Sequence, residues 1–339
     1  MFNKGLSLDQ APPASVPFKF FLTAPIFGII LGLVFFFYPP ASIIDQYSPV
    51  AIALVHLFTL GMLAMIIFGA MQQMMPVLAG AVIKKPMLFG NIVHASLCIG
   101  TLSFSGSFLF SNKILLMVGA TFLAIAFLVF FVTAIYLLYK VEFLTSTVNA
   151  MRIFAATGII TALIGLHLAG SYISGNIGSM HFNFVNTHAA FGLFGFGAVL
   201  IMGVAFQVIP MFYVALDFPK YVQNKIPIFV LGLIIAIGLF SFLNVDIYIL
   251  KILLAVMFIL FSAYGLNSLN HRRRPVFDVT LWFWKLSLYM FIISMLNWAF
   301  VPQDSMFMLA IIFGFGFLYS LLQGMMYKII PFLAWFHLS

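Results

Sequence analysis

The sequence carries very little charge, and this scarcity excludes a soluble protein. Of 339 residues, 15 are Lys or Arg and 7 are Asp or Glu, so that only 6% are charged, against about 25% in soluble globular domains. Apolar residues make up 64% of the chain. Because so few charges cannot solvate a globule of this length, a lipid bilayer must cover most of its surface. The same count excludes a nucleic-acid-binding face and a sizeable soluble domain.

Cysteine is nearly absent as well, and no acid falls inside an apolar run. The single Cys98 excludes an internal disulfide and any cysteine cluster for zinc or iron–sulfur. The seven acids all lie away from the middle of the apolar runs: Asp9, Asp45, Glu142, Asp217, Asp246, Asp278 and Asp304. Since a coupled ion or proton transporter normally places a carboxylate within the membrane, this class is disfavoured. The sequence also offers no nucleophile or carboxylate pair for hydrolytic or transferase chemistry.

Long apolar runs, separated by short breaker-rich connections, predict an all-α integral membrane protein. A bilayer core needs about 20 apolar residues per helix. This length gives ten transmembrane helices, at 17–38, 49–78, 87–110, 114–139, 148–173, 182–214, 226–243, 247–269, 278–300 and 306–334. The first run is too long for a signal-peptide core, so we expect it to be retained. No linker suggests a second domain, and residues 1–339 are predicted to form one membrane domain.

The asymmetric placement of the basic residues predicts how the chain is oriented. With the N-terminus inside, Lys4 and twelve other Lys or Arg residues fall on the cytoplasmic side, and only Lys113 and Lys251 fall outside. Because positively charged loops stay cytoplasmic, both termini are predicted to be cytoplasmic, in a bacterial inner (cytoplasmic) membrane. The net charge of +8 then reflects topology and contact with anionic lipid.

One pattern of glycine and proline occurs three times. It reads Gly61-x7-Gly69-x6-Pro76, Gly195-x7-Gly203-x6-Pro210 and Gly316-x7-Gly324-x6-Pro331. Composition alone would give about 0.08 copies. The copies predict a four-helix repeat at about 17–139 and 148–269, followed by a truncated third repeat at about 278–334. The glycines would let helices approach closely and the prolines would bend them, while Gln73 and Gln207, three residues before their prolines, would satisfy the carbonyls that proline releases.

Histidines are the strongest candidates for cofactor chemistry. His56 and His188 lie one or two turns into the second and sixth spans, and His167 lies near the end of the fifth. All three fall about 10 Å below the outer surface, at a rise of about 1.5 Å per residue. Neutral imidazole coordinates haem iron and copper. The alternative is that each histidine only hydrogen-bonds a neighbouring helix, an interaction worth about 0.6 kcal/mol.

Methionines Met71, Met74 and Met75 offer a second, weaker metal hypothesis. They precede Pro76 in the second span, and thioether sulfur is a soft ligand suited to copper(I). Methionine more often fills irregular space beside a helix kink, so packing is the favoured interpretation of this cluster.

The second, sixth and tenth spans resemble the haem-copper oxidase subunit I superfamily, in particular its small divergent members and the NnrS-like nitric-oxide-response membrane proteins. The stretch His56-Leu57-Phe58-Thr59-Leu60-Gly61 through Pro76 carries the resemblance, together with His188 through Pro210 and the helix of Gly316, Gly324 and Pro331. The resemblance implies four-helix units around a pseudo-threefold axis. It also implies that His56 ligates a low-spin haem and that His188 occupies the place of a copper ligand.

The sequence departs from that family at several ligand positions. The tenth-helix His-x-His is replaced by Leu309 and Ile311, and 226–243 contains no histidine. A complete oxygen reductase is therefore not expected. The resemblance instead implies a b-type haem held by His56, with His167 or His188 as second ligand and the glycines admitting the macrocycle between helices.

The predicted role is electron transfer or the binding of nitric oxide or another small gas, with a respiratory-chain or cytochrome partner. The alternatives are copper handling or small-molecule transport on the same scaffold, and a cofactor-free partner of a respiratory complex.

Overall fold

The protein is all-α, and its long helices agree with the predicted spans. A computed structural model describes residues 10–301 and 306–338, so the predictions for Lys4, Asp9 and Asp304 lie outside the described residues. Within these described residues, ten helices are long and apolar enough to cross a membrane, which confirms the predicted number and makes this a multi-pass integral membrane protein.

Nine of the ten spans begin within two residues of the prediction, and the seventh does not. Helix α10 covers Lys220–Phe242, whereas the prediction begins at 226. Pro219 precedes the first helical residue, and Val222 is buried in the first turns. The polar first turn is therefore helical because it packs, although its composition resembles a loop.

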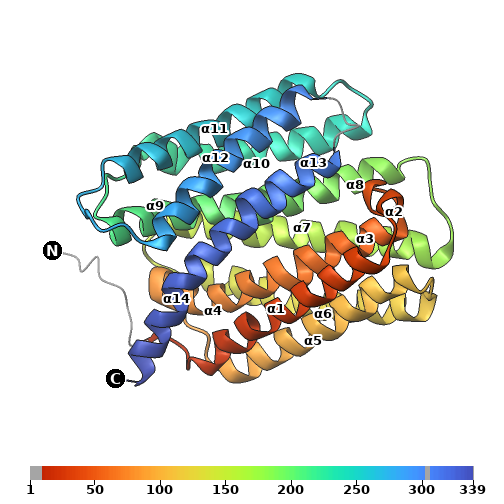
Figure 1. The fold of residues 1–339 in the computed structure, drawn as a ribbon, viewed down its shortest axis with the longest axis horizontal. Coiled ribbons are helices and arrows are strands. Elements are labelled where there is room, and N and C mark those ends of the chain that lie inside the picture. The colour runs from red at the N-terminus through yellow and green to blue at the C-terminus, as the bar shows by residue number, and fades with distance from the viewer. Residues whose placement is uncertain (1–9, 302–305, 339) are drawn as a thin grey trace. The chain divides into compact units, whose positions relative to one another are not determined.

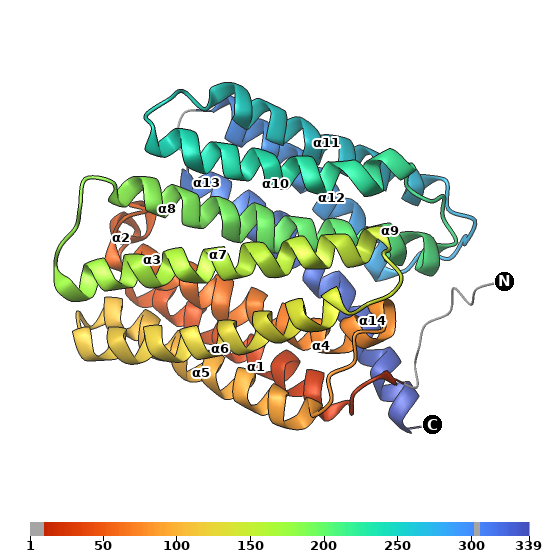
Figure 2. The same ribbon diagram turned by 180° about the vertical axis from the view of Figure 1, so that it is seen from behind.

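The chain divides into two compact units. Unit 1 comprises Met1–Phe143, Gly165–Asn176 and Leu333–Ser339, and unit 2 comprises Leu144–Ile164 and Ile177–Phe332. Unit 1 contains α1 (Ser15–Phe37), α2 (Pro40–Ile44), α3 (Pro49–His56), the π-helix η2 (Leu57–Ala64), α4 (Met65–Ala79), α5 (Pro86–Leu109) and α6 (Lys113–Tyr139). Within it, α1 packs on η2 and α4, while α5 packs along α6 (Figures 1 and 2).

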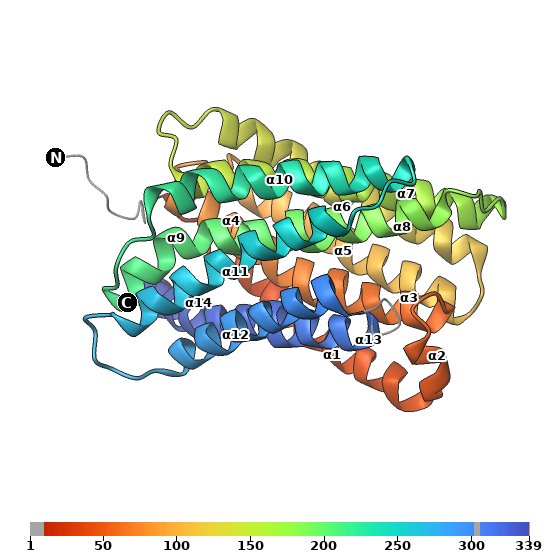
Figure 3. The same cartoon turned by 90° about the horizontal axis from the view of Figure 1, so that it is seen from above.

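Unit 2 has the same kind of helical packing. It contains α8 (His181–Ala190), the π-helix η3 (Phe191–Ala198), α9 (Val199–Tyr213), α10, α11 (Tyr248–Asn270), α12 (Val279–Phe300), α13 (Met306–Ala310), the π-helix η5 (Ile311–Tyr319) and most of α14 (Ser320–Leu338). Helices α10, α11 and α12 run side by side (Figure 3). Helix α7 (Ser146–Ser174) contributes its first part to unit 2 and residues 165–174 to unit 1.

The three spans with the glycine–proline pattern each contain a π-helical segment. These segments end at Ala64, Ala198 and Tyr319, and each end lies twelve residues before the proline of its span, Pro76, Pro210 and Pro331. π-Helix is rare, occurs mostly as single turns within α-helices and is frequent at functional sites. Each π segment also includes the first glycine of its pattern.

The patterned glycines pack against a single neighbouring helix in each case. A Cβ added to the first glycine of each pattern would overlap with Phe27 of α1, Thr157 of α7 or Met290 of α12; at the second glycine the overlaps are with Phe20, Ala150 and Phe283 of the same three helices. Within each pair the contacted residues are seven apart, and the glycines are eight apart. Only glycine permits this approach, and the three helix pairs therefore share one contact register.

Candidate functional site

His56 lies where α3 changes into η2 in unit 1. Its Nδ1 lies 2.8 Å from the carbonyl oxygen of Ile52, one turn earlier, and its ring contacts that of Phe104 with centroids 4.8 Å apart. Because a carbonyl can only accept, Nδ1 carries the proton and Nε2 carries the lone pair. This is the usual tautomer of a metal-ligating histidine, whose second nitrogen donates to a carbonyl or carboxylate.

His188 is held in the same way in unit 2. It lies on α8, three residues before η3 begins, and its Nδ1 lies 3.0 Å from the carbonyl oxygen of Thr161 on α7. The proton therefore belongs on Nδ1 here as well. The chemistry of both side chains fits coordination through Nε2.

His167 lies on α7 with an exposed side chain. Its helical neighbours Leu166, Ala169 and Tyr172 pack around Phe104 and other residues of one apolar cluster. Within residues 10–301 and 306–338, no three His, Cys, Asp or Glu side chains converge as a metal centre requires. Haem ligation by His56, His167 or His188 stays a prediction.

The glycines do not leave open space for a macrocycle at the two positions that flank α1. The volume that side chains at Gly61 and Gly69 would fill is occupied by Phe27 and Phe20. The expectation that these glycines admit a porphyrin is therefore wrong: they bring α1 close to η2 and α4.

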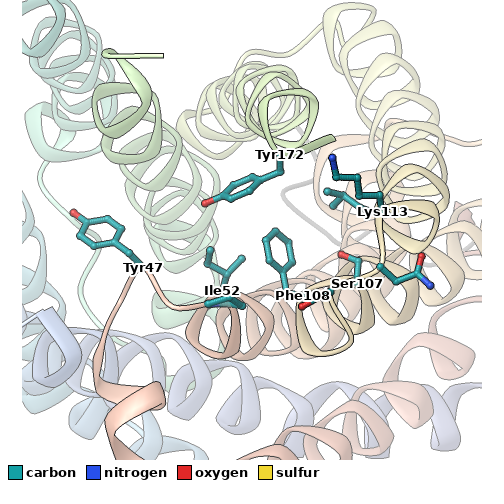
Figure 4. A pocket seen from close by; sticks show the side chains of 10 residues that line it. Tyr47, Ile52, Ser107, Phe108, Lys113 and Tyr172 are labelled. Carbon is teal, nitrogen blue, oxygen red and sulfur yellow. The ribbon is translucent and has the colours of Figure 1, made fainter. Parts of the chain in front are cut away.

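A pocket of about 210 Å³ opens at the end of unit 1 where α5 connects to α6 (Figure 4). Its lining comes from the start of α3, the α5–α6 turn and the end of α7: Tyr47, Pro49, Ile52, Ser107, Phe108, Ser111, Asn112, Lys113, Leu116 and Tyr172. Figure 4 shows Tyr47 and Lys113 on opposite sides of the hollow, with Tyr172 facing Ile52 and Phe108 across it. Lys113 is the only charged residue in the lining.

Aromatic rings connect this pocket with His56. Tyr172 contacts Phe108 with ring centroids 5.4 Å apart, Phe108 contacts Phe104 at 5.3 Å, and Phe104 contacts His56. Ile52, whose carbonyl accepts from His56, also lines the pocket. Along the helix, the imidazole of His56 therefore lies one turn from Ile52 of the lining. Through the rings, only Phe104 separates it from Phe108 of the lining.

A polar network at the opposite end of α5 was not anticipated from the sequence. The hydroxyl of Thr23 donates to the carbonyl oxygen of Lys19 at 2.7 Å and lies 2.8 Å from Nε2 of His94. Because the hydroxyl proton is already used, Nε2 donates to it. Lys19 in turn donates to the side chain of Asn91. His94 thus bridges α1 and α5.

Unit 1 also contains buried polar atoms without a partner in the described part of the chain. They are Oε1 of Gln72, both amide atoms of Gln73, and the hydroxyls of Thr101 and Ser105. All four side chains are at most 6% exposed. The expectation that Gln73 satisfies a carbonyl released by Pro76 is therefore wrong. Gln72 instead donates to the carbonyl oxygen of Phe68, at 3.1 Å.

Two of these residues belong to a polar stripe along α5. His94, Cys98, Thr101 and Ser105 follow one another at intervals of four, three and four residues, the spacing of a single helix face. The sequence shows this spacing, but it does not show that the hydroxyls of Thr101 and Ser105 lack hydrogen-bond partners. Each buried polar atom without a partner calls for an explanation, and a bound water or ligand is one.

The third patterned span has a charge where the first two have an amide. Lys328 pairs with Asp278 at 2.6 Å, and both side chains are 25% exposed. Burial acts to raise the pKa of Asp278, but hydrogen bonds from Lys328, Thr280 and the backbone N–H of Leu281 outweigh it and lower the pKa below its ordinary value. Asp278 lies just before α12 and caps it.

Comparison of the chain with protein-family models, with curated proteins and with solved structures gave no match. The case for a function therefore depends on the geometry described above.

Proposed function

We propose that this chain is a non-oxidase relative of haem-copper oxidase subunit I that binds a b-type haem for electron transfer or for binding nitric oxide or another small gas. The observation that carries the proposal is the position of His56. It stands at the junction of α3 and a π-helical segment, and the hydrogen bond from Nδ1 to Ile52 directs its coordinating capacity to Nε2.

The shared contact register of three helix pairs supports the proposed repeat. In each pair a π segment ends twelve residues before a proline, and two glycines meet side chains seven residues apart on the preceding helix. Three copies of one unit account for this agreement. The same scaffold would lie in the bacterial cytoplasmic membrane with both termini inside, and it would pass electrons to a respiratory-chain or cytochrome partner.

Within this proposal the histidines have separate roles. His56 would hold the haem iron, which supplies redox chemistry when bound, and His167 is the candidate second ligand within unit 1. His188, held by the carbonyl of Thr161, would keep the position that binds copper in the family. Leu309 and Ile311 cannot coordinate copper, so no oxygen-reducing centre is proposed.

The absorption spectrum of the purified, detergent-solubilised chain tests the proposal. We expect a Soret band with a sharp reduced α-band, and His56→Ala should remove most of both. His271→Ala is the matched control, because His271 makes the same bond to the carbonyl four residues earlier, at 2.9 Å, but is exposed. A spectrum unchanged in His56→Ala would refute the assignment. A colourless protein with stoichiometric copper would favour the copper-handling alternative, for which Met71 and Met75 are buried candidates.

A further inference from the structure

The pocket at the α5–α6 end of unit 1 has the properties of a binding site for a small molecule. Its volume of about 210 Å³ is below the range of about 300–1,000 Å³ typical of drug-sized ligands. At about 30 Å³ per water molecule, it would hold a body of roughly seven waters. A ligand of the size of a single ring with one polar group fits this volume.

Hydrogen bonds close the turn that forms one rim of the pocket. Ser111 has a positive φ of 51°, which few non-glycine residues adopt. The turn around it is closed by hydrogen bonds from the N–H groups of Phe110 to Gly106 and of Asn112 to Ser107, both at 2.9 Å. The side chain of Asn112 then caps α6 by accepting from Ile114 and Leu115. The backbone of Lys113 therefore follows directly on a turn that hydrogen bonds close.

The charge in the pocket selects an anion. Lys113 is the only charged residue of the lining, and it is the first residue of α6, a 27-residue helix. The positive end of the helix dipole adds to the ammonium charge there. Asp45, two residues before Tyr47 of the lining, accepts from the backbone N–H of Tyr47 at 3.0 Å and does not line the pocket.

The remaining walls select an apolar body attached to that anion. Ile52, Leu116 and Pro49 are aliphatic, and Phe108 and Tyr172 present rings (Figure 4). Free phosphate or another compact inorganic anion would leave these walls without contacts. A ring would instead gain stacked or edge-to-face contacts with Phe108 and Tyr172 beyond the burial of its apolar surface.

We propose that this pocket binds a small organic carboxylate, with the carboxylate on Lys113 and its apolar body between Phe108, Tyr172 and Ile52. The carboxylate could be dissolved in water or could belong to a fatty acid from the membrane, since both share this chemistry. The proposed carboxylate site requires no haem. It can therefore be refuted while the proposed haem function holds, and the haem function can be refuted while the carboxylate site holds.

Ligand-observed NMR on the purified full chain in an uncharged detergent tests the proposal with two probes, benzoate and laurate. Saturable binding of benzoate, without binding of benzyl alcohol, would show a water-soluble ligand. Saturable binding of laurate alone would show a membrane-derived one. Either result supports the proposal. No saturable binding of either probe would overturn it.

Variants locate the binding. Lys113→Gln and Phe108→Ala should each weaken it at least about tenfold. The matched controls are Lys251→Gln, a lysine over Trp298 in unit 2, and Phe110→Ala, an exposed ring at the same end of α5 that does not line the pocket. Both controls should bind as the unaltered chain does. Equal affinity in Lys113→Gln and the unaltered chain would also overturn the proposal.

Discussion

Among the described residues, unit 1 leaves some buried hydroxyls without a hydrogen-bond partner and unit 2 leaves none. In unit 2 buried hydroxyls such as those of Thr157, Ser262 and Ser294 donate to carbonyls one turn earlier, at 2.7–2.9 Å. In unit 1 Thr101 and Ser105, which are equally buried on α5, make no such bond in the described part of the chain. Arg272 Nε is the one buried side-chain atom without a partner among the described residues of unit 2.

This difference is informative because the two units otherwise share their packing. Both place glycines against a neighbouring helix and both contain a π segment. A hydroxyl that donates to its own helix is already satisfied, whereas a buried hydroxyl without a partner costs free energy unless a water or ligand supplies one. Unit 1, which also contains His56 and the pocket, is therefore where a water or ligand is to be sought first.

The largest expected effect tests the close glycine packing that the two units share. Gly69→Leu in unit 1 and Gly203→Leu in unit 2 should each destabilise the fold by more than about 3 kcal/mol or prevent folding, because Phe20 and Ala150 occupy the space. Gly32→Leu and Gly232→Leu, which meet nothing within 4 Å, are the controls and should fold normally. Thermal unfolding in detergent measures this. Normal folding of Gly69→Leu or Gly203→Leu would show that the helices do not approach as described.

A matched pair of threonines tests the difference between the units. Thr157→Val removes hydrogen bonds to Ile153 and Phe154 and should destabilise unit 2 by about 1 kcal/mol. Thr101→Val removes an orphan hydroxyl that is 0% exposed, so it should be neutral or stabilising by up to about 1–3 kcal/mol. Unfolding midpoints compare the two. Destabilisation by Thr101→Val would instead reveal a partner for that hydroxyl, such as a buried water.

The smallest effect concerns the ion pair of unit 2. Because hydrogen bonds hold the pKa of Asp278 below its ordinary value, the pair stabilises the fold above the unfolded pKa of about 3.9. This stabilisation is lost as the pH falls through the lower folded pKa. Asp278→Asn should lower stability at pH 7 by less than about 1 kcal/mol, and the deficit should vanish in acid. A deficit independent of pH would assign the loss to the helix cap alone.

Part of this arrangement was predictable from the sequence and part was not. The number of spans depends on composition, and the glycine packing depends on the spacing of one residue type. Both could therefore be predicted. The helical start of α10 could not be predicted. It depends on the packing of Val222, and the polar residues around Val222 give no sign of that packing. The partner of His94 depends on Thr23, 71 residues away, and no local pattern encodes such a contact. The lack of a hydrogen-bond partner for the Thr101 hydroxyl likewise depends on which side chains surround it in the folded chain.

The ion pair between Lys328 and Asp278 bears on how the chain enters the membrane. A lysine costs about 2.5–3.5 kcal/mol at the centre of an inserting segment. Lys328 lies nearer the C-terminal end of the last span, in α14, so a smaller part of this cost applies to it. The compensating carboxylate sits at the start of α12, one hairpin earlier. The final two spans should accordingly partition into lipid together as a pair, so that biogenesis of the C-terminal segment depends on a residue made about fifty positions before it.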